Sequence, residues 1–383
     1  MTINAVEFAA ELIKCPSVTP RDAGALDLLE KALTSIGFAC TRLPFEEEDT
    51  ARVDNLFAQY GSGAPHFCFA GHTDVVPVGD EDAWSKDPFA GQIEDGVLWG
   101  RGAADMKGAI AAFVAAVADF IETSAPEQGS ISLLITGDEE GPSVNGTVKM
   151  LQWLADNNIQ IDDCIVGEPT NPHNMGEMVK IGRRGSVNGV VTVNGKQGHV
   201  AYPHRADNPV PHLLRLMQAL SDAEIDQGSE HFQPSNLEVT SFDVCNATTN
   251  VIPAKAQARF NIRYNDLWSR DTINAWVEKT LAEAVQGCDM DLKLVHSGES
   301  FLTETGALTD IISDAITSVT GKEADLSTTG GTSDARFISQ YARVVEFGLV
   351  GETMHQVDER VRTADIEALT QIYGKILTAY FQA

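Results

Sequence analysis

Short apolar runs that each end at a glycine constrain the fold of this chain more than any other feature. The clearest of them cover residues 66–70, 131–136 and 164–166. Runs of this length, with glycine at the end, are typical of buried strands. Segments with the spacing of amphipathic helices alternate with them, at residues 2–13, 23–36, 106–121 and 144–154. Alternation of this kind predicts an α/β domain in which helices flank a sheet.

The middle of the chain has a different pattern. Strand-like runs occur at residues 186–193, 237–244, 256–264 and 290–295, and helical segments occur at residues 209–220 and 269–285. The third of these runs alternates strictly between apolar and polar side chains, which is typical of a half-buried strand. The resulting β-α-β-β-α-β order predicts a ferredoxin-like fold.

Charge sets the same middle segment apart. The whole chain has a formal net charge of −28, whereas residues 180–293 contain 12 Lys and Arg against 13 Asp and Glu. A nearly neutral segment in a strongly acidic chain indicates a separate domain, where an anionic substrate would be tolerated. A chain of 383 residues is also too long for one ordinary core. We therefore predict an α/β domain in two parts, residues 1–179 and 294–383, and an inserted domain at residues 180–293.

Composition excludes several classes of partner. The net charge of −28 argues against nucleic acid, because a phosphate backbone requires a basic surface. No apolar run reaches the roughly 18 residues that span a membrane, and residues 1–11 lack the basic start of a signal peptide. The six cysteines include no CxxC pair, which favours free thiols in a reducing cytoplasm. We expect a cytoplasmic protein that binds neither nucleic acid nor membranes.

Side chains that bind metals or carry protons lie at the ends of the predicted elements. Four of them follow predicted strands: His72, Glu139, Glu140 and Glu168. Asp105 precedes the helix predicted from residue 106, and His355 lies close to a glycine-rich run. In α/β sheets, ligands bind outside the carboxyl ends of the strands. We therefore expect these side chains to converge on one site.

The chemistry of these residue types is that of a metal-dependent hydrolase. Imidazoles and carboxylates are ligands that suit zinc. His72 and Asp74 are two residues apart on an extended segment and project to the same side, so Asp74 is a candidate to hold the second ring nitrogen of His72. The adjacent carboxylates of Glu139 and Glu140 point apart, so one can bind metal while the other moves protons for a reacting water.

Each feature also has a simpler explanation. Asp105 would serve well as a helix N-cap, and the acids at residues 138–140 could form a solvated turn. The glycine-rich segment 330–334 is either a backbone nest for an anion or a flexible turn. Arg183 or Arg184 either grips a carboxylate with its planar fork or lies on a solvent-facing strand edge. Only the joint order of the motifs favours one site.

That joint order resembles a known family. The motifs lie at residues 71–74, 100–108, 138–141, 167–170 and 353–355. They resemble the co-catalytic zinc aminoacylase/carboxypeptidase metallohydrolase family, and the resemblance extends over essentially the whole chain. It implies a zinc-exopeptidase-like α/β catalytic domain with a mixed sheet flanked by helices. It also implies an inserted ferredoxin-like α+β domain that acts in dimerisation or as a lid.

Further motifs narrow the resemblance to one activity. They lie at residues 75–79, 182–186, 195–203 and 330–334. They imply hydrolysis of N-succinyl-LL-2,6-diaminopimelate to LL-2,6-diaminopimelate and succinate, a step in the biosynthesis of lysine and cell-wall precursors. A deacetylase of acetylornithine or an aminoacylase from the same family is one alternative. A metal-binding relative without catalytic activity is another.

The resemblance also implies roles at a metal centre. Two Zn²⁺ ions per subunit would be held by His72, Asp105, Glu140, Glu168 and His355. Asp105 would bridge the ions, with His72 and Glu168 completing one site and Glu140 and His355 the other. Co²⁺ is an alternative to zinc at one of these sites. Glu139 would act as the general base, with Asp74 orienting His72.

A small anionic substrate is implied as well. Its candidate contacts are Arg183, Ser186, Tyr202, Asn250, Arg263, Gly331 and Thr332. His199 would reach from the inserted domain of the partner subunit to stabilise the developing oxyanion, which implies a homodimer formed through that domain. Gly351 stands where relatives commonly carry asparagine, so that contact is not expected here.

Overall fold

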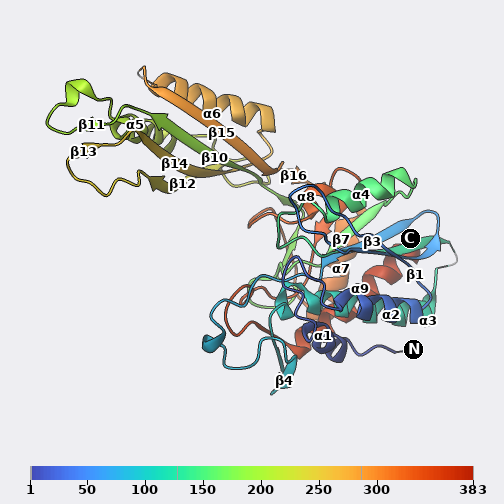
Figure 1. Cartoon of the computed structure of the whole chain (residues 1–383). Helices are drawn as coiled ribbons and strands as arrows, with labels where there is room; N and C mark the ends of the chain where they lie inside the picture. The colour runs from blue at the N-terminus through green and yellow to red at the C-terminus, as the bar shows by residue number, and fades with distance from the viewer. Residues whose placement is uncertain (1, 127, 286, 383) are drawn as a thin grey trace. The chain divides into compact units, whose positions relative to one another are not determined.

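The computed structural model describes residues 2–126, 128–285 and 287–382 (Figure 1). Contacts divide the chain into two compact units. The first, here called the sheet unit, comprises the chain up to Ile181, then Thr303–Ser327, and the chain from Ser333 onward. The second, here called the insert, comprises Gly182–Leu302 and Thr328–Thr332.

The second boundary expected from the sequence is wrong. A division after residue 293 would fall inside strand β15 (Asp289–Gly298). The insert instead continues to β16 (Phe301–Leu302), which pairs antiparallel with β9 (Gly182–Arg183). The chain therefore enters and leaves the insert through two adjacent strands. Net charge did not mark this point, because the last residues of β15 continue the pairing with β10 beyond the neutral segment.

The sheet unit contains one mixed sheet of eight strands, in the order β1-β2-β6-β3-β7-β18-β8-β17. Their bounds are β1 (Ala39–Arg42), β2 (Leu56–Ser62), β3 (His66–His72), β6 (Gly129–Thr136), β7 (Asp163–Val166), β8 (Met178–Lys180), β17 (Asp325–Ser327) and β18 (Arg343–Glu346). Strand β3 runs parallel to both β6 and β7. Every residue of these three strands is buried, as the apolar runs predicted. A small separate sheet combines β4 (Gln92–Glu94), β5 (Val97–Trp99) and β19 (Arg360–Arg362).

Helices accompany this sheet. They are α1 (Ala5–Ile13), α2 (Ala25–Ser35), α3 (Gly108–Ser124), α4 (Thr147–Asp156), α7 (Ala307–Thr320), α8 (Ala335–Ile338) and α9 (Thr363–Gln382). Helix α3 packs against α1 and α9 and is buried along most of its length. Its Phe113 stacks on Phe69 of β3 with ring centroids 4.4 Å apart, and Tyr373 of α9 meets both rings edge-on. The expected α/β class is confirmed.

The expected helix cap at Asp105 is wrong. Helix α3 begins at Gly108, and its N-terminus has no side-chain cap. The backbone of Asp105 is extended, with φ −123° and ψ 95°, inside an irregular turn at Ala103–Lys107. Because of this conformation, the Asp105 carboxylate faces two histidines rather than the first amides of the helix.

The insert has the expected ferredoxin-like topology. Its sheet has the order β12-β14-β10-β15, and each pairing is antiparallel. The remaining bounds are β10 (Gly185–Asn194), β12 (Asn236–Asp243), β14 (Lys255–Tyr264), α5 (Pro209–Asp222) and α6 (Arg270–Ala284). One apolar core joins both helices to the sheet, with Val191, Leu216, Phe260 and Val277 among its buried residues. The alternating side chains of β14 place Phe260 and Ile262 in this core and leave Arg259 and Arg263 outside it.

The two ends of the insert are far apart. Strands β9 and β16 lie at the end where the chain crosses to the sheet unit. A short ribbon of β11 (Gly198–His199) and β13 (Val251–Ile252) follows the far end of β10 (Figure 1). The 10 residues of β10 separate these ends. At about 3.3 Å per residue, the separation is roughly 30 Å.

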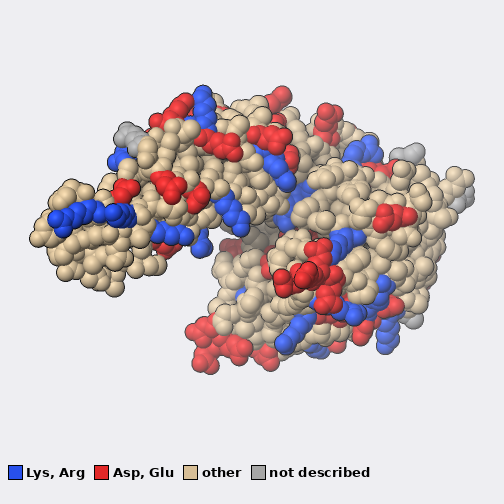
Figure 2. Space-filling model, turned by 45° about the horizontal axis from the view of Figure 1, so that its top comes forward, with Lys and Arg blue, Asp and Glu red and all other residues tan. Residues whose placement is uncertain are grey.

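The surface is strongly acidic, as the net charge of −28 requires. Figure 2 shows acidic side chains gathered in several dense groups, with basic side chains scattered between them. Among the described residues, no helix is both long enough and apolar enough to cross a membrane.

Two aromatic rings of β14 occupy the space beside glycines of β10. A methyl group placed on Gly189 would lie 2.0 Å from the Phe260 ring. Because that ring is buried, we expect Gly189→Ala to lower the free energy of unfolding by about 1–3 kcal/mol through overpacking. Chemical denaturation measures the change. Gly374→Ala in α9 is the matched control, because its added methyl meets no atom within 4 Å. Alanine favours a helix over glycine, so this variant should be as stable as the unmodified protein or more stable by up to about 1 kcal/mol.

Candidate metal centre

The candidate ligands gather at one edge of the central sheet. In the register of the parallel strands, His72 lies opposite Thr136, and Ala70 lies opposite Val166. The carboxyl ends of β3, β6 and β7 therefore meet at the same edge. His72 closes β3, Glu139 and Glu140 follow β6, and Glu168 follows β7. The strand pattern alone brings these four side chains together.

Asp105 lies at the middle of the cluster. Its Oδ1 is 3.1 Å from Nε2 of His72, and its Oδ2 is 3.3 Å from Nε2 of His355. The two oxygens of one carboxylate thus face two different imidazoles. This arrangement is the one that a carboxylate needs to share two cations.

One further carboxylate approaches each imidazole. Oε1 of Glu140 is 2.8 Å from Nε2 of His355, and Oε1 of Glu168 is 3.8 Å from Nε2 of His72. Two half-sites result, each with one histidine and one glutamate, and Asp105 is common to both. Glu139 also lies close, with a carboxylate oxygen within 4.8 Å of ligand atoms of His72 and Glu168. All five residues predicted as ligands therefore lie together.

The orientation of His72 is fixed by a main-chain group. Its Nδ1 lies 2.9 Å from the carbonyl oxygen of Asp74, which keeps the ring proton on Nδ1 and leaves Nε2 to face Asp105. The Asp74 carboxylate is farther away, at 3.7 Å. It accepts hydrogen bonds from the backbone amides of Glu139 and Glu140, at 3.3 and 3.0 Å. Asp74 thus positions the acidic pair as well as the histidine.

Burial and crowding disturb the protonation of the cluster. Burial and the nearby charges of Asp334 and Asp105 raise the pKa of Glu139 to about 8. Burial, with the charges of Asp105 and Glu139, raises the pKa of Glu168 well above its usual range. Hydrogen bonds to Asp105 and Glu140 raise the pKa of His355 to about 10. Each shift reduces the excess of negative charge that the fold has collected.

These properties fit divalent cations. Among the described residues, the cluster has four carboxylates and two imidazoles within contact distance, and Oε1 of Glu168 is buried without a hydrogen-bond donor. A buried carboxylate oxygen without a donor is costly unless a cation neutralises it. Mixed imidazole and carboxylate ligands are typical of zinc sites in hydrolases. The residues present therefore fit divalent metal ions, with Asp105 between the two half-sites.

Several predicted substrate contacts lie at the end of the insert where the chain crosses. Ser186 of β10 and Arg263 of β14 are register partners, and Asn261 bonds to both, at 3.2 Å to Ser186 and 3.0 Å to Arg263. Arg183 is buried and donates to the carbonyl of Thr329 at 3.2 Å. Gly331 and Thr332 follow that carbonyl in the same unit. Asn261 was not predicted as a site residue, because its only distinguishing feature in the sequence is its place on the polar side of its strand.

The other predicted contacts lie at the far end of the insert. His199 is exposed, and its ring centroid is 5.7 Å from that of Tyr202. Asn250 is also exposed, and its carbonyl accepts from the amide of Val200 at 3.1 Å. Since β10 separates the two ends, one insert does not bring His199, Tyr202 and Asn250 together with Arg183 and Ser186.

Residues that were not predicted as site residues support the centre. Asp334 is buried, accepts from the Thr147 hydroxyl at 2.6 Å, and contributes to the raised pKa of Glu139. Near Gly351, the side-chain amide of Asn171 donates to the carbonyl of Gly348 at 2.8 Å. The backbone amide of Gly351 donates to the backbone carbonyl of Asn171 at 2.9 Å. Asn171 therefore holds the segment that leads to His355.

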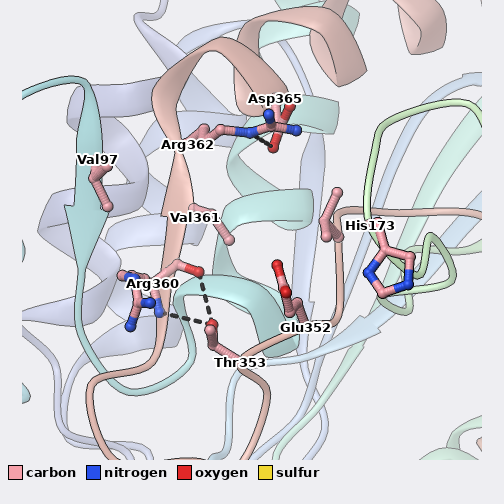
Figure 3. A pocket seen from close by; sticks show the side chains of 9 residues that line it. Val97, His173, Glu352, Thr353, Arg360, Val361, Arg362 and Asp365 are labelled. Atoms are coloured by element: carbon pink, nitrogen blue, oxygen red, sulfur yellow. Dashed lines mark hydrogen bonds and ion pairs between the residues drawn. The ribbon is translucent and has the colours of Figure 1, made fainter.

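A separate pocket of about 180 Å³ lies beside the segment that carries His355 (Figure 3). His173, Glu352, Thr353 and Arg362 are among its lining residues. None of the clustered ligand-type side chains lines it. This pocket is therefore distinct from the metal centre, although the two share one loop.

Comparisons with known proteins agree with this geometry. The chain is 56% identical over 382 residues to the succinyl-diaminopimelate desuccinylase of Beijerinckia indica, covering all of both chains. It is 57% identical over 378 residues to the protein of the same name from Parvibaculum lavamentivorans, covering 98% of this chain and 95% of the relative.

Solved structures share the fold at low sequence identity. An M20 family metallo-carboxypeptidase from Sulfolobus solfataricus matches with a TM-score of 0.80, 17% identity and 99% coverage of both chains. A dinuclear metal-binding peptidase of the M20 family from Bacillus subtilis matches with a TM-score of 0.69, 12% identity, and coverage of 99% and 98%. The profile of the peptidase family M20/M25/M40 matches residues 68–379. The resemblance inferred from the motifs is confirmed, and the chain belongs to the peptidase family M20/M25/M40.

Proposed function

We propose that this chain is a metal-dependent amide hydrolase that converts N-succinyl-LL-2,6-diaminopimelate and water into LL-2,6-diaminopimelate and succinate. The observation that carries the proposal is the Asp105 carboxylate between His72 and His355, with Glu139 beside it. Full-length relatives at 54–57% identity, named as succinyl-diaminopimelate desuccinylases, support the choice of substrate. The reaction belongs to lysine and cell-wall precursor biosynthesis. Six free cysteines support a cytoplasmic location.

Two Zn²⁺ ions per subunit are the proposed cofactor, with Co²⁺ as an alternative at one site. His72 and Glu168 would hold one ion, Glu140 and His355 the other, and Asp105 both. When bound, the ions supply Lewis acidity to the amide carbonyl and make a water acidic enough to react near neutral pH. The short contacts within each half-site support this division of the ligands.

Glu139 is the proposed general base. It takes the proton of the attacking water and delivers it to the leaving amine, so that the amine departs neutral. Its partly buried position favours this role, because burial raises its pKa to about 8 in the metal-free protein. Bound cations would lower this value, which leaves the carboxylate ionised and ready to accept a proton. The backbone amides of Glu139 and Glu140 donate to the Asp74 carboxylate, and these hydrogen bonds help to fix the orientation of both residues.

The substrate carries several carboxylates, and the insert contains arginine side chains that can bind them. Arg183, Ser186 and Arg263, with Gly331 and Thr332, form one proposed group of contacts. Planar guanidinium groups suit carboxylates because they can donate two parallel hydrogen bonds. Tyr202 and Asn250 belong to the proposed second group, with His199. The near neutrality of the insert in an otherwise acidic chain supports binding of an anion there.

A homodimer through the insert is proposed for the second group. His199, Tyr202 and Asn250 lie roughly 30 Å along β10 from the end where the chain crosses. We propose that they serve the active site of a second copy, where His199 would stabilise the oxyanion of the tetrahedral intermediate. Their exposure in the single chain supports this role.

A substrate panel tests the proposed function. The metal-loaded protein should hydrolyse N-succinyl-LL-2,6-diaminopimelate far faster than N-acetylornithine or N-acetylated amino acids, as product formation would show. Exhaustive chelation should abolish turnover, and added zinc should restore it. A preference for the acetylated substrates would instead indicate a deacetylase or aminoacylase. Turnover that survives complete metal removal would rule out the hydrolase class proposed here.

Glu139→Ala tests the general base. The variant should bind both metal ions, because Glu139 is not a proposed ligand, yet its kcat should fall by about 10²–10⁴-fold or more. Metal analysis and steady-state kinetics measure the two effects. Glu94→Ala, which removes an exposed acid on β4, is the control and should retain full activity. Near-normal turnover of Glu139→Ala would falsify the assignment.

Mixed dimers test the role of His199. Glu139→Ala and His199→Ala should each be nearly inactive alone. After the two variants are mixed and allowed to exchange subunits, activity should return, because each mixed dimer contains one site with Glu139 of one copy and His199 of the other. If His199 acts within its own subunit, no site is complete and no activity returns.

A further inference from the structure

Arg101 and Glu359 form a buried ion pair beside the metal centre. Nη1 of Arg101 lies 2.6 Å from Oε2 of Glu359, and the two side chains are 2% and 0% exposed. Neither residue is a proposed ligand or substrate contact. Taking two charges out of water is costly, so further hydrogen bonds to the two side chains help to stabilise a pair of this kind. Apart from a contact to the carbonyl of Pro77, these bonds go to main-chain groups of two metal-ligand segments.

Glu359 holds the segment of the bridging carboxylate. Its Oε1 accepts hydrogen bonds from the backbone amides of Ala104 and Asp105, at 3.0 and 3.2 Å. These amides lie in the irregular turn before α3, where the backbone of Asp105 is extended rather than helical. Glu359 therefore fixes the peptide from which the Asp105 carboxylate projects.

Arg101 holds the segment of the last histidine. Its Nη1 donates to the carbonyl of Gln356 at 3.2 Å, and its Nη2 lies 3.5 Å from the carbonyl of His355. The ring of Trp84 covers the guanidinium at 5.2 Å. His355 has a positive φ of 62°, a conformation that needs support from its surroundings. Arg101 supplies that support from the inner side of the loop.

A second set of hydrogen bonds, between Thr353 and Arg360, closes the base of the same loop. The Thr353 hydroxyl donates to the carbonyl of Arg360 at 2.8 Å and accepts from its amide at 3.0 Å (Figure 3). The loop from Thr353 to Arg360 thus has a fixed base. Both His355 and Glu359 lie within it. Displacement of this loop would move a ligand and the support of the bridging ligand together.

We propose that Arg101 and Glu359 are positioning residues that couple Asp105 to His355, and that they thereby set the affinity of the metal site formed by Glu140, His355 and Asp105. The inference rests on the two-metal centre proposed above. The other site depends less on the pair. Its His72 is oriented by the carbonyl of Asp74, and its Glu168 follows β7, so it shares only Asp105.

Two conservative variants test the coupling. Glu359→Asp keeps the charge and shortens the reach to the two amides. Arg101→Lys keeps the charge and loses the fork that reaches Gln356. Each should weaken one of the two Zn²⁺ sites by about 10–100-fold, the usual effect of losing a partner that orients a ligand, and the other site by clearly less. Competition with a chromophoric chelator measures both affinities, and the visible spectrum of Co²⁺ reports on each site.

Arg343→Lys is the control variant. Arg343 forms a bidentate pair with the buried carboxylate of Asp163, with both contacts at 2.7 Å. The two residues begin strands β18 and β7, whereas the metal centre lies at the carboxyl ends of the parallel strands. This variant should keep both metal affinities, because it removes the bidentate geometry of an ion pair that contacts no metal-ligand segment. Thermal unfolding of all three variants shows whether they fold. If Glu359→Asp does not fold, the metal affinities of Arg101→Lys test the coupling alone.

The outcomes separate the inference from the function on which it rests. Two ions bound by the unmodified protein, with one site selectively weakened in the variants, support the coupling. Unchanged affinities in both variants would overturn it, as would an equal loss in Arg343→Lys. A single ion bound by the unmodified protein would instead overturn the two-metal centre, and the inference with it.

Discussion

Negative charge concentrated at one edge of a sheet is the constraint on which this structure depends. Parallel strands that end together bring Glu139, Glu140 and Glu168 within reach of one another, and Asp105 joins them from the irregular turn that precedes α3. Two imidazoles alone do not neutralise these acids, and burial makes each remaining charge expensive. The raised pKa values of Glu139 and Glu168 express this imbalance. A bound cation would offset the negative charge that this fold buries.

The framework of the site was predictable because it depends on periodicity. Apolar runs that end at glycine marked β3, β6 and β7, and the polar residues that follow them lie at the same edge. The strict alternation in β14 predicted which of its side chains enter the core of the insert. The fold class and the family followed from these patterns and the motifs. In each case a single local rule determined both the element and the direction of its side chains.

Features that depend on contacts distant in sequence could not be predicted in the same way. Asp105 has the local pattern of a helix cap, but its carboxylate faces His72 and His355, and Glu359 accepts from its backbone amide. The carboxylate of Asp74 serves two backbone amides that no spacing rule connects to it. Glu359 lies 258 positions from Arg101, in a run of charged residues that resembles any solvated turn. Pairing between distant segments settles such roles.

The order of segments along the chain has a consequence for how the protein is made. Strand β18 lies between β7 and β8 in the sheet, and α9 packs on α3, yet both follow the insert in sequence. During synthesis the insert can complete its own core first, because its elements are contiguous. The sheet unit cannot close until β18 and α9 have followed the insert. His355 and Glu359 also follow the insert, so the cluster of metal-ligand side chains is completed only after the insert has been made.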